Sequence, residues 1–358
     1  MRRDTLVVSL VLGVALITGA RAGATPISVY GAWHCGNDTC EWKTIRNMTD
    51  FDQKNHWIVD RGDGSGLPSV NVVILSFVNP LKLVNRTNDA GTVNGVPIGM
   101  TPAVVEYFRS RGIRVMLSIG GITFVKDWDQ ALAQNATQLG LNAAAVARQL
   151  GVGIDIDYEQ NRNPNLAGLQ AFIDAYRSQI PYDATGNDHA ARLTIDVAEG
   201  DTWLPDINRK ATTEWLTTSR PVIDYAHAMV PAHQARDAAT AIKGWSQHIN
   251  GYPGLTTPPL APAKLAVSLF LVPNTGTKIL PECVNFASSL QSSTGSWVQT
   301  VAPAGAGTSA GVQGYMFWAA ECQGRGTCTT PPNTCEGGMG VAASTYNIPI
   351  PMPALRQQ

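Results

Sequence analysis

The sequence predicts an α/β protein built as a (β/α)8 barrel with a single large domain. Eight short runs of β-branched and apolar residues recur along the chain, and helical or loop-like segments separate them. The runs begin roughly 30 to 47 residues apart, which suits βα units that carry loop insertions. With 358 residues, of which 44% are hydrophobic and 15% charged, the chain can bury a large core. An open, doubly wound sheet would give the same alternation and is the alternative.

The predicted strands cover residues 27–32, 71–78, 114–119, 152–158, 192–197, 222–229, 264–271 and 311–318. A helix is predicted between the second and third of them, because Thr101 and Pro102 suit its N-cap and first turn and Gly112 follows its end. Residues 143–150 and 166–179 also carry apolar side chains at helical spacing. The alternation of strand and helix therefore continues through the middle of the chain.

The two ends of the chain differ from this pattern. Arg2 and Arg3 precede an apolar run at residues 6–17 and then small residues with Ala-x-Ala spacing, which predicts a signal peptide over residues 1–24. The barrel is expected at residues 25–320, and an irregular tail rich in Gly, Pro, Thr and Cys at residues 321–358. No later apolar stretch reaches about 18 residues, so we expect a secreted protein without membrane contact after cleavage.

Six cysteines occur in this exported chain, and an even number favours disulfides over metal ligands. The sequence leaves the pairing open. Short loops favour one bond near each end of the barrel, with Cys35 and Cys40 at the first end. The second bond is expected among the C-terminal three, Cys322, Cys328 and Cys335, and Cys283 is the sixth cysteine.

The formal net charge is −1, and no dense cluster of Lys or Arg occurs, so nucleic acid and anionic lipid are poor candidates for partners. A neutral partner fits better. Nine Trp and nine Tyr supply flat apolar faces for sugar rings, although such residues also pack cores. We expect a monomer with no cofactor and no metal.

Three carboxylates stand at alternate positions in the fourth predicted strand: Asp155, Asp157 and Glu159. Strand periodicity places them on one face, while the apolar or aromatic residues between them face the helices. Close carboxylates resist simultaneous ionisation, so one stays protonated while a neighbour is ionised, as cleavage of a glycosidic bond requires. The alternatives are a metal-binding cluster and a solvated strand end.

This segment resembles the D-x-x-D-x-D-x-E signature of the family 18 glycoside hydrolases, which are chitinases and endo-β-N-acetylglucosaminidases. The run LSIGG at residues 117–121 is similar to the S-x-G-G motif of that family. Ser76 and Phe77 resemble its second strand, and YMFW at residues 315–318 resembles its eighth. The resemblance therefore extends over most of the predicted barrel.

The resemblance implies that Glu159 protonates the glycosidic oxygen while the N-acetyl carbonyl of the substrate attacks the anomeric carbon. Asp157 would orient and stabilise the resulting oxazolinium ion, and Asp155 would share a proton with Asp157. Trp318 would lie beneath the reacting sugar. The remaining pocket positions are expected at Tyr30, Phe77, Gly120, Gly121 and Met229. A tight turn at the glycines and simple core packing of Trp318 are the structural alternatives.

Two positions depart from the family pattern. Val152 stands where the signature begins with Asp. Side chains alternate between the two faces of a strand, so Val152, three positions before Asp155, should point away from the carboxylates. Pro231 stands where the family has a tyrosine that holds the acetamido group of the substrate. The candidates to replace that tyrosine are Tyr225, His227 and His233.

These observations predict a secreted glycosidase that binds and cleaves β-1,4-linked N-acetylglucosamine glycans, either chitin or the chitobiose core of N-glycans, with retention of configuration. One alternative is a catalytically impaired descendant that acts as a lectin-like binding protein or an enzyme inhibitor. Another is a hydrolase that acts on a different glycan without help from an acetamido group.

Overall fold

The computed structural model describes residues 27–60, 64–229, 238–270, 290–303, 310–318 and 320. Eight parallel strands close into a barrel in the order β1-β10-β9-β8-β7-β6-β5-β2. They are β1 (Val29–His34), β2 (Val72–Val78), β5 (Arg114–Gly120), β6 (Gly153–Asp157), β7 (Leu193–Val197), β8 (Tyr225–Ala228), β9 (Leu265–Phe270) and β10 (Gly314–Trp318). All eight predicted strands and the barrel class are confirmed, and the open sheet is ruled out.

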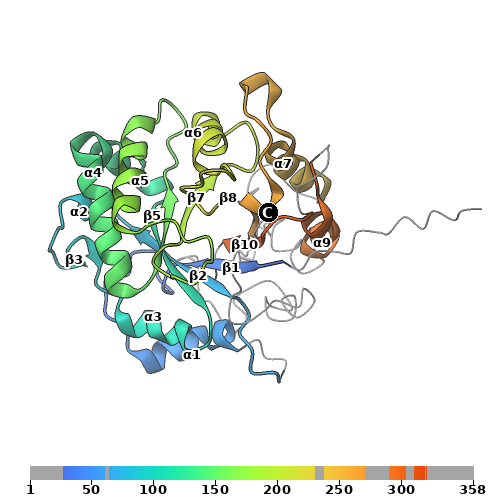
Figure 1. The fold of residues 1–358 in the computed structure, drawn as a ribbon. Coiled ribbons are helices and arrows are strands. Elements are labelled where there is room, and N and C mark those ends of the chain that lie inside the picture. Colours follow the sequence, from blue (N-terminus) through green and yellow to red (C-terminus); the bar gives the residue numbers. More distant parts are fainter. Residues whose placement is uncertain are drawn as a thin grey trace, which may run out of the picture.

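The helices surround the barrel in chain order, from α1 in blue through α4 and α5 in green to α9 in orange-red (Figure 1). They are α1 (Met48–Val59), α2 (Pro80–Val84), α3 (Pro102–Arg109), α4 (Val125–Leu150), α5 (Leu166–Gln179), α6 (Pro205–Lys210), α7 (Ala238–Asn250) and α9 (Leu290–Thr300). A two-stranded hairpin, β3 (Thr92–Val93) and β4 (Val96–Pro97), lies outside the barrel.

Local sequence signals place the helix ends. The Thr101 side chain accepts a hydrogen bond from the Val104 N–H at the start of α3, and Pro102 occupies the first turn. Helix α5 covers the range predicted from the sequence. Helix α4 is much longer than the predicted 143–150, and Asn135 interrupts its helical backbone. No described helix has the length and apolarity that crossing a membrane requires.

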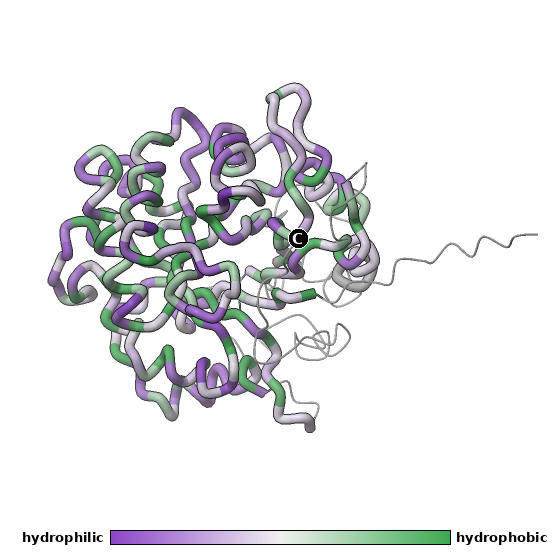
Figure 2. The backbone as a smooth tube through the Cα atoms, in the orientation of Figure 1, coloured by the Kyte–Doolittle hydropathy of each residue, from purple (hydrophilic) through white to green (hydrophobic). Residues whose placement is uncertain are grey.

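Hydrophobic residues form two clusters on the two sides of the sheet. The larger lies between the strands and the helices and includes Ile154 and Ile156 of β6 and Tyr158 just after it. The smaller fills the barrel interior with Val29, Trp33, Val72, Ile74, Met116, Tyr225, Ala266 and Met316. Hydrophilic segments are frequent on the outer helices and loops (Figure 2). Strand alternation thus sets the two faces, and it decides which side chains reach the interior.

The amino ends of the strands carry a buried ion cluster around Asp224. Its carboxylate lies 3.2 Å from Nη2 of Arg177 and 3.8 Å from Nε of Arg192, and it accepts the Leu193 N–H over 2.7 Å. Nζ of Lys264 donates to the Asp224 carbonyl over 3.1 Å. Arg192, Asp224 and Lys264 stand just before β7, β8 and β9, and Arg177 reaches them from α5. The cluster therefore ties three strands and one helix at the end opposite the carboxylates of β6.

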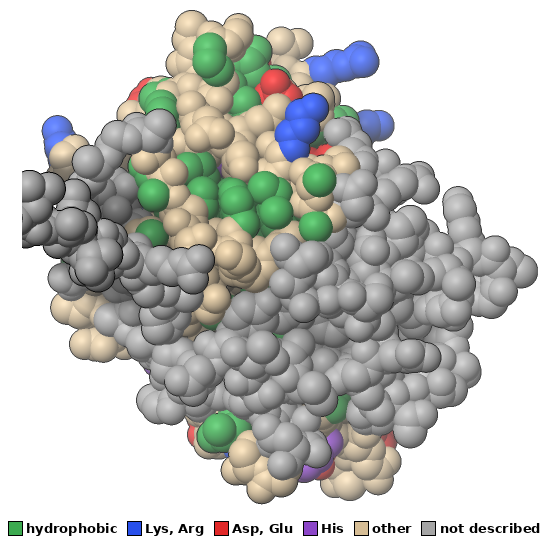
Figure 3. Space-filling view, turned by 90° about the vertical axis from the view of Figure 1, so that its right-hand side faces the viewer, with side chains coloured by type: hydrophobic (Ala, Val, Ile, Leu, Met, Phe, Trp, Pro, Cys, Tyr) green, Lys and Arg blue, Asp and Glu red, His purple; other side chains and the backbone are tan. Residues whose placement is uncertain are grey.

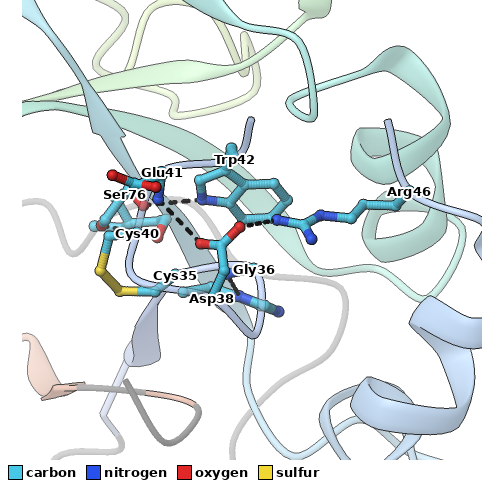
Figure 4. Close-up of a disulfide and its surroundings, with 10 residues drawn as sticks. Cys35, Gly36, Asp38, Cys40, Glu41, Trp42, Arg46 and Ser76 are labelled. Carbon is cyan, nitrogen blue, oxygen red and sulfur yellow. Dashed lines mark hydrogen bonds and ion pairs between the residues drawn. A yellow bond between two sulfur atoms is a disulfide. The ribbon is translucent and has the colours of Figure 1, made fainter. Parts of the chain in front are cut away.

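A disulfide between Cys35 and Cys40 closes the loop that follows β1 (Figure 4), which confirms the pair favoured by its short loop. The buried Trp42 donates its indole N–H to the Ser76 carbonyl over 2.9 Å, and Arg46 pairs with Asp38. The loop is therefore fastened to the carboxyl end of β2.

Several predicted features lie outside the described residues: the signal peptide at 1–24, the tail at 321–358, and Cys283, Cys322, Cys328 and Cys335. The domain boundaries stay a prediction.

Candidate active site

Strand β6 brings its carboxylates to the carboxyl end of the barrel. In register, Asp155 lies between Ser118 of β5 and Thr194 of β7, and Asp157 lies beside Gly120 of β5. The alternate residues of β6 pack outward, as strand periodicity predicts. Asp155 therefore sits deeper in the interior than Asp157, and Glu159 follows just beyond the strand.

Asp155 is fully buried and hydrogen-bonded on both oxygens. Thr194 Oγ1 donates to Oδ1 over 2.6 Å, and Trp33 Nε1 donates to Oδ2 over 3.3 Å. His227 Nδ1 lies 3.4 Å from Oδ1. Burial alone would raise the pKa of Asp155, but the hydrogen bond and charge of His227, with the bonds from Thr194 and Trp33, hold that pKa below its ordinary value.

Asp157 has the opposite environment. Its carboxyl is buried, and no described group forms a hydrogen bond with its Oδ1. Burial raises its pKa well above the ordinary value, and the negative charges of Glu159, Asp196 and Asp155 raise it further. The surroundings of Asp157 therefore favour its protonated form, whereas those of Asp155 favour the ion, and Oδ1 of Asp157 has no partner among the described groups.

Glu159 lies at the mouth of this carboxylate row and is half-buried. Burial raises its pKa to about 7, although the Ile122 N–H donates to its carboxylate and opposes the rise. The preceding Tyr158 is anchored outside the barrel, where its hydroxyl bonds to Asp129 and accepts the Asn165 N–H over 3.0 Å. Glu159 is thus a carboxyl that titrates near neutral pH on a fixed loop.

Gly120 and Gly121 allow the backbone of β5 to approach this row. The Gly121 N–H and the Trp128 indole both donate to the Asp157 carbonyl over 3.0 Å. A Cβ on Gly120, whose φ is +122°, would lie 1.9 Å from that same carbonyl oxygen. A Cβ on Gly121 would lie 3.0 Å from the Phe77 ring. The turn role, which was the structural alternative, accounts for both glycines.

Aromatic rings lie beside the carboxylates. Phe77 stacks on Trp318 with ring centroids 5.6 Å apart and an interplanar angle of 27°. Trp33 meets the edge of Trp318 at 6.3 Å and stands nearly perpendicular to the His227 ring at 5.3 Å. Trp318 packs against the interior cluster but is only half-buried, so part of its surface remains exposed.

The structure does not bring every predicted pocket residue to this place. Tyr30 points to the other side of β1, where its ring packs 4.9 Å from Phe317, because its even number gives it the opposite face from Trp33. Met229 packs against the same outer cluster. Tyr225 and His227 do lie in the interior, with ring centroids 5.1 Å apart. Pro231 and His233 are outside the described residues.

Sequence reasoning missed Asp196 and Trp33. Asp196 is buried on β7, and burial raises its pKa well above the ordinary value, as do the charges of Asp155 and Glu159 and a hydrogen bond with Asp155. The alternation of Thr194 and Asp196 with apolar residues in the fifth strand was the available signal. Trp33 lay just beyond the predicted end of the first strand.

Asp155, Asp196 and His227 offer one ligand atom each within 4.8 Å of one another, a spacing that would suit a cation. The same spacing follows from one shared hydrogen-bond donor, because His227 Nδ1 lies 3.1 Å from Asp196 and 3.4 Å from Asp155. We therefore describe this group as a hydrogen-bonded cluster.

Comparison with solved structures places this barrel among chitinase folds. A GH18 chitinase from Pseudoalteromonas aurantia matches with a TM-score of 0.52 and 14% identity, over 78% of this chain and 93% of that chain. The chitinase RmChi1 from Rhizomucor miehei matches with a TM-score of 0.50 and 14% identity, over 88% of this chain and 98% of that chain. No family model and no curated protein matches the sequence. At this identity the likeness shows a GH18-like fold.

Proposed function

Starting from this GH18-like barrel, we propose that the protein is a glycosidase that cleaves β-1,4-linked N-acetylglucosamine glycans, chitin or the chitobiose core of N-glycans. One observation carries the proposal: three carboxyls lie close together, and their different surroundings shift their pKa values apart. The pKa of Asp155 is lowered, that of Asp157 is raised, and that of Glu159 is raised to about 7. Such a separation assigns acid and anion roles to like groups.

In this mechanism, protonated Glu159 donates its proton to the glycosidic oxygen as the bond to the anomeric carbon breaks. The N-acetyl carbonyl oxygen of the same sugar attacks that carbon and forms an oxazolinium ion. Ionised Glu159 then takes a proton from water, which opens the ion at the anomeric carbon from the leaving-group side. Two inversions give net retention.

The substrate's acetamido group needs a holder, since Pro231 stands where the family has its tyrosine. We assign this role to Asp157, whose Oδ1 is buried without a partner among the described groups. A buried polar atom without a partner costs free energy that a ligand's N–H can recover. Trp318 and the stacked Phe77 would carry the apolar face of the reacting sugar.

A neutral glycan also agrees with the surface. On the face shown in Figure 3, described charged side chains are few, and hydrophobic side chains gather among uncharged ones. The net charge of −1 gives no long-range attraction for a polyanion. The N-terminal sequence pattern supports secretion, and we expect a monomer to act on its glycan outside the cell.

The second candidate is a lectin-like protein that binds the same glycans without cleaving them, and Pro231 favours it. The test is incubation of the mature protein, Glu159→Gln and Glu199→Gln with chitin oligosaccharides and a high-mannose glycopeptide, followed by mass spectrometry. Glu199 is a matched control, because burial also raises its pKa to about 7. We expect Glu159→Gln to lose roughly 100- to 10,000-fold in rate and Glu199→Gln to cleave normally.

Proton NMR of the first product should show the retained β-anomer. Binding of either substrate by the native protein without any cleavage would establish the lectin-like reading instead. Cleavage by Glu159→Gln at the native rate would remove Glu159 as the acid.

A further inference from the structure

His227 stands between two carboxylates inside the barrel. Its Nδ1 lies 3.1 Å from Oδ1 of Asp196 on β7 and 3.4 Å from Oδ1 of Asp155 on β6. The ring is fully buried, and the Tyr225 ring lies beside it with the centroids 5.1 Å apart. Trp33 meets the ring nearly at right angles, at 5.3 Å. A histidine that only filled the core would need one acceptor, whereas this one faces two.

The groups around His227 come from every strand packed against it. Strand β6 supplies Asp155, β7 supplies Asp196 and the uncharged Thr194, and Tyr225 stands on β8 itself. Strand β9 places the uncharged Ala266 beside His227 in register. Asp157 and Glu159 lie farther from His227. Their charges interact with those of its two neighbours: Asp157 with Asp155 and Asp196, and Glu159 with Asp196. His227 is thus the one basic group on the carboxylate row among the described residues.

We propose that His227 is a positioning residue. Asp196 fixes the His227 ring, and the ring in turn fixes the orientation of Asp155, which lies deeper in the barrel than Asp157. His227 Nδ1 and Thr194 Oγ1 both approach Oδ1 of Asp155, while Trp33 binds Oδ2. Three strands besides β6 therefore fix the orientation of one carboxylate. The role rests on the proposed function, because it concerns the carboxyl pair that serves the acid.

The charges of this cluster follow from its contacts. Burial would lower the pKa of His227, but the hydrogen bond and charge of Asp155 raise it above its ordinary value. The pKa of Asp196 is raised and that of Asp155 is lowered. These directions favour a cationic His227 beside an anionic Asp155 and a protonated Asp196, an arrangement in which the buried charges cancel.

The first experiment needs no substrate. NMR of protein labelled with 15N at histidine, titrated from pH 5 to 9, should show the His227 imidazolium persisting above its reference pKa of about 6.5. In Asp155→Asn the His227 midpoint should fall, since the anion that favours its charge is gone. His248, whose pKa burial lowers to about 4, is the internal control and should stay neutral in both proteins. A neutral His227 throughout the titration of the native protein would overturn the proposal.

The second experiment compares His227→Gln, Asp196→Asn and His248→Gln in glycan cleavage. Loss of the His227 cation raises the pKa of every nearby carboxyl. The alkaline limb of the pH profile of kcat should therefore move to higher pH in His227→Gln, by at least about 0.5 unit. Its kcat should fall about 10- to 100-fold, with KM changed less than about threefold. His248→Gln should keep the native profile, and Asp196→Asn, whose amide oxygen can still accept from the His227 ring, should shift the profile less than His227→Gln does.

The two hypotheses fail in different ways. An ordinary titration of His227 in a protein that still cleaves glycans would refute the positioning role alone. A raised titration in a protein that cleaves nothing would refute the glycosidase and leave the cluster as described. If His227→Gln does not fold, the Asp155→Asn titration decides.

Discussion

The indole N–H of Trp33 donates a hydrogen bond to Oδ2 of Asp155 over 3.3 Å. The two residues belong to β1 and β6, and β2 and β5 lie between these strands in the barrel. Trp33 therefore reaches across the interior to the deepest carboxylate. Its ring also contacts Trp318 and His227, so one side chain joins the carboxylate row to the aromatic group.

Trp33→Phe should keep an aromatic ring there but remove the hydrogen bond. Because that bond favours ionised Asp155, its loss should raise the pKa of Asp155 and lower kcat about 10-fold. Urea denaturation should show that the free energy of unfolding falls by about 1 kcal/mol for the lost hydrogen bond, and by more if the smaller ring leaves a cavity. Trp57→Phe on α1 is the control, because it shortens a buried tryptophan in the outer cluster, on the other side of the sheet from the carboxylates. Equal activity losses in both variants would contradict the role of this bond.

Cleavage should decline as pH rises through about 7, because Glu159 must hold a proton to act and its pKa is about 7. The folded state also favours that proton. The resulting stability is fully present below pH 4.5, the reference value for the unfolded chain, and is lost as the pH rises through about 7.

Between pH 4 and 8, the free energy of unfolding of the native protein should therefore fall by on the order of 2–3 kcal/mol relative to that of Glu159→Gln. Urea unfolding of both proteins at several pH values measures this difference. Parallel stability curves would show that Glu159 has an ordinary pKa.

Gly120→Ala should destabilise the barrel by several kcal/mol, because its Cβ would overlap the Asp157 carbonyl oxygen and the Trp128 indole nitrogen. Gly254→Ala is the matched control, since a Cβ there has open space around it. Thermal unfolding followed by circular dichroism compares the two. A native melting temperature for Gly120→Ala would mean that β5 does not approach β6 as described.

Trp318→Ala should weaken glycan binding about 10-fold or more, since stacking of an aromatic ring against a sugar is lost along with its contact to Phe77. Trp318→Phe keeps a ring and should recover part of the affinity. Calorimetric titration of chitin oligosaccharide into the Glu159→Gln background avoids cleavage during the measurement. Unchanged affinity in the alanine variant would place the sugar elsewhere.

Asp224→Asn should lower stability by about 3–5 kcal/mol, because Arg177 and Arg192 would lose their buried carboxylate. The pH profile of cleavage should not change, since this cluster lies at the opposite end of the barrel. Asp89→Asn, which breaks an exposed pair with Lys82, should leave the free energy of unfolding nearly unchanged. A shift of the pH profile in Asp224→Asn would show that the two ends are coupled.

The fold could be predicted because each strand carries its own signal. Alternation within β6 placed Asp155 and Asp157 opposite Ile154 and Ile156, and no distant contact was needed for that inference. The same rule would have excluded Tyr30. Tyr30 was expected in the pocket, but side chains alternate along β1. Tyr30 therefore lies on the opposite face from Trp33, where it packs against Phe317.

The partners of the carboxylates could not be predicted in the same way. Thr194, His227 and Trp33 reach Asp155 from three other strands, and their meeting depends on the register between strands and on barrel closure. Periodicity gives the face of a residue but not its height relative to another strand. The lowered pKa of Asp155 therefore emerged only from the three-dimensional arrangement.

Closure between β1 and β10 has a consequence for how this protein forms. Contacts such as the one from Ser28 to Gln313 span 285 residues, and Trp318 of β10 lies against Phe77 of β2. Folding slows as the average sequence separation of contacts grows, so the step that seals the barrel should come late. Under the proposed function, a newly made chain would carry the carboxylates of β6 before Trp318 reaches Phe77, so glycan binding would begin only when β10 docks.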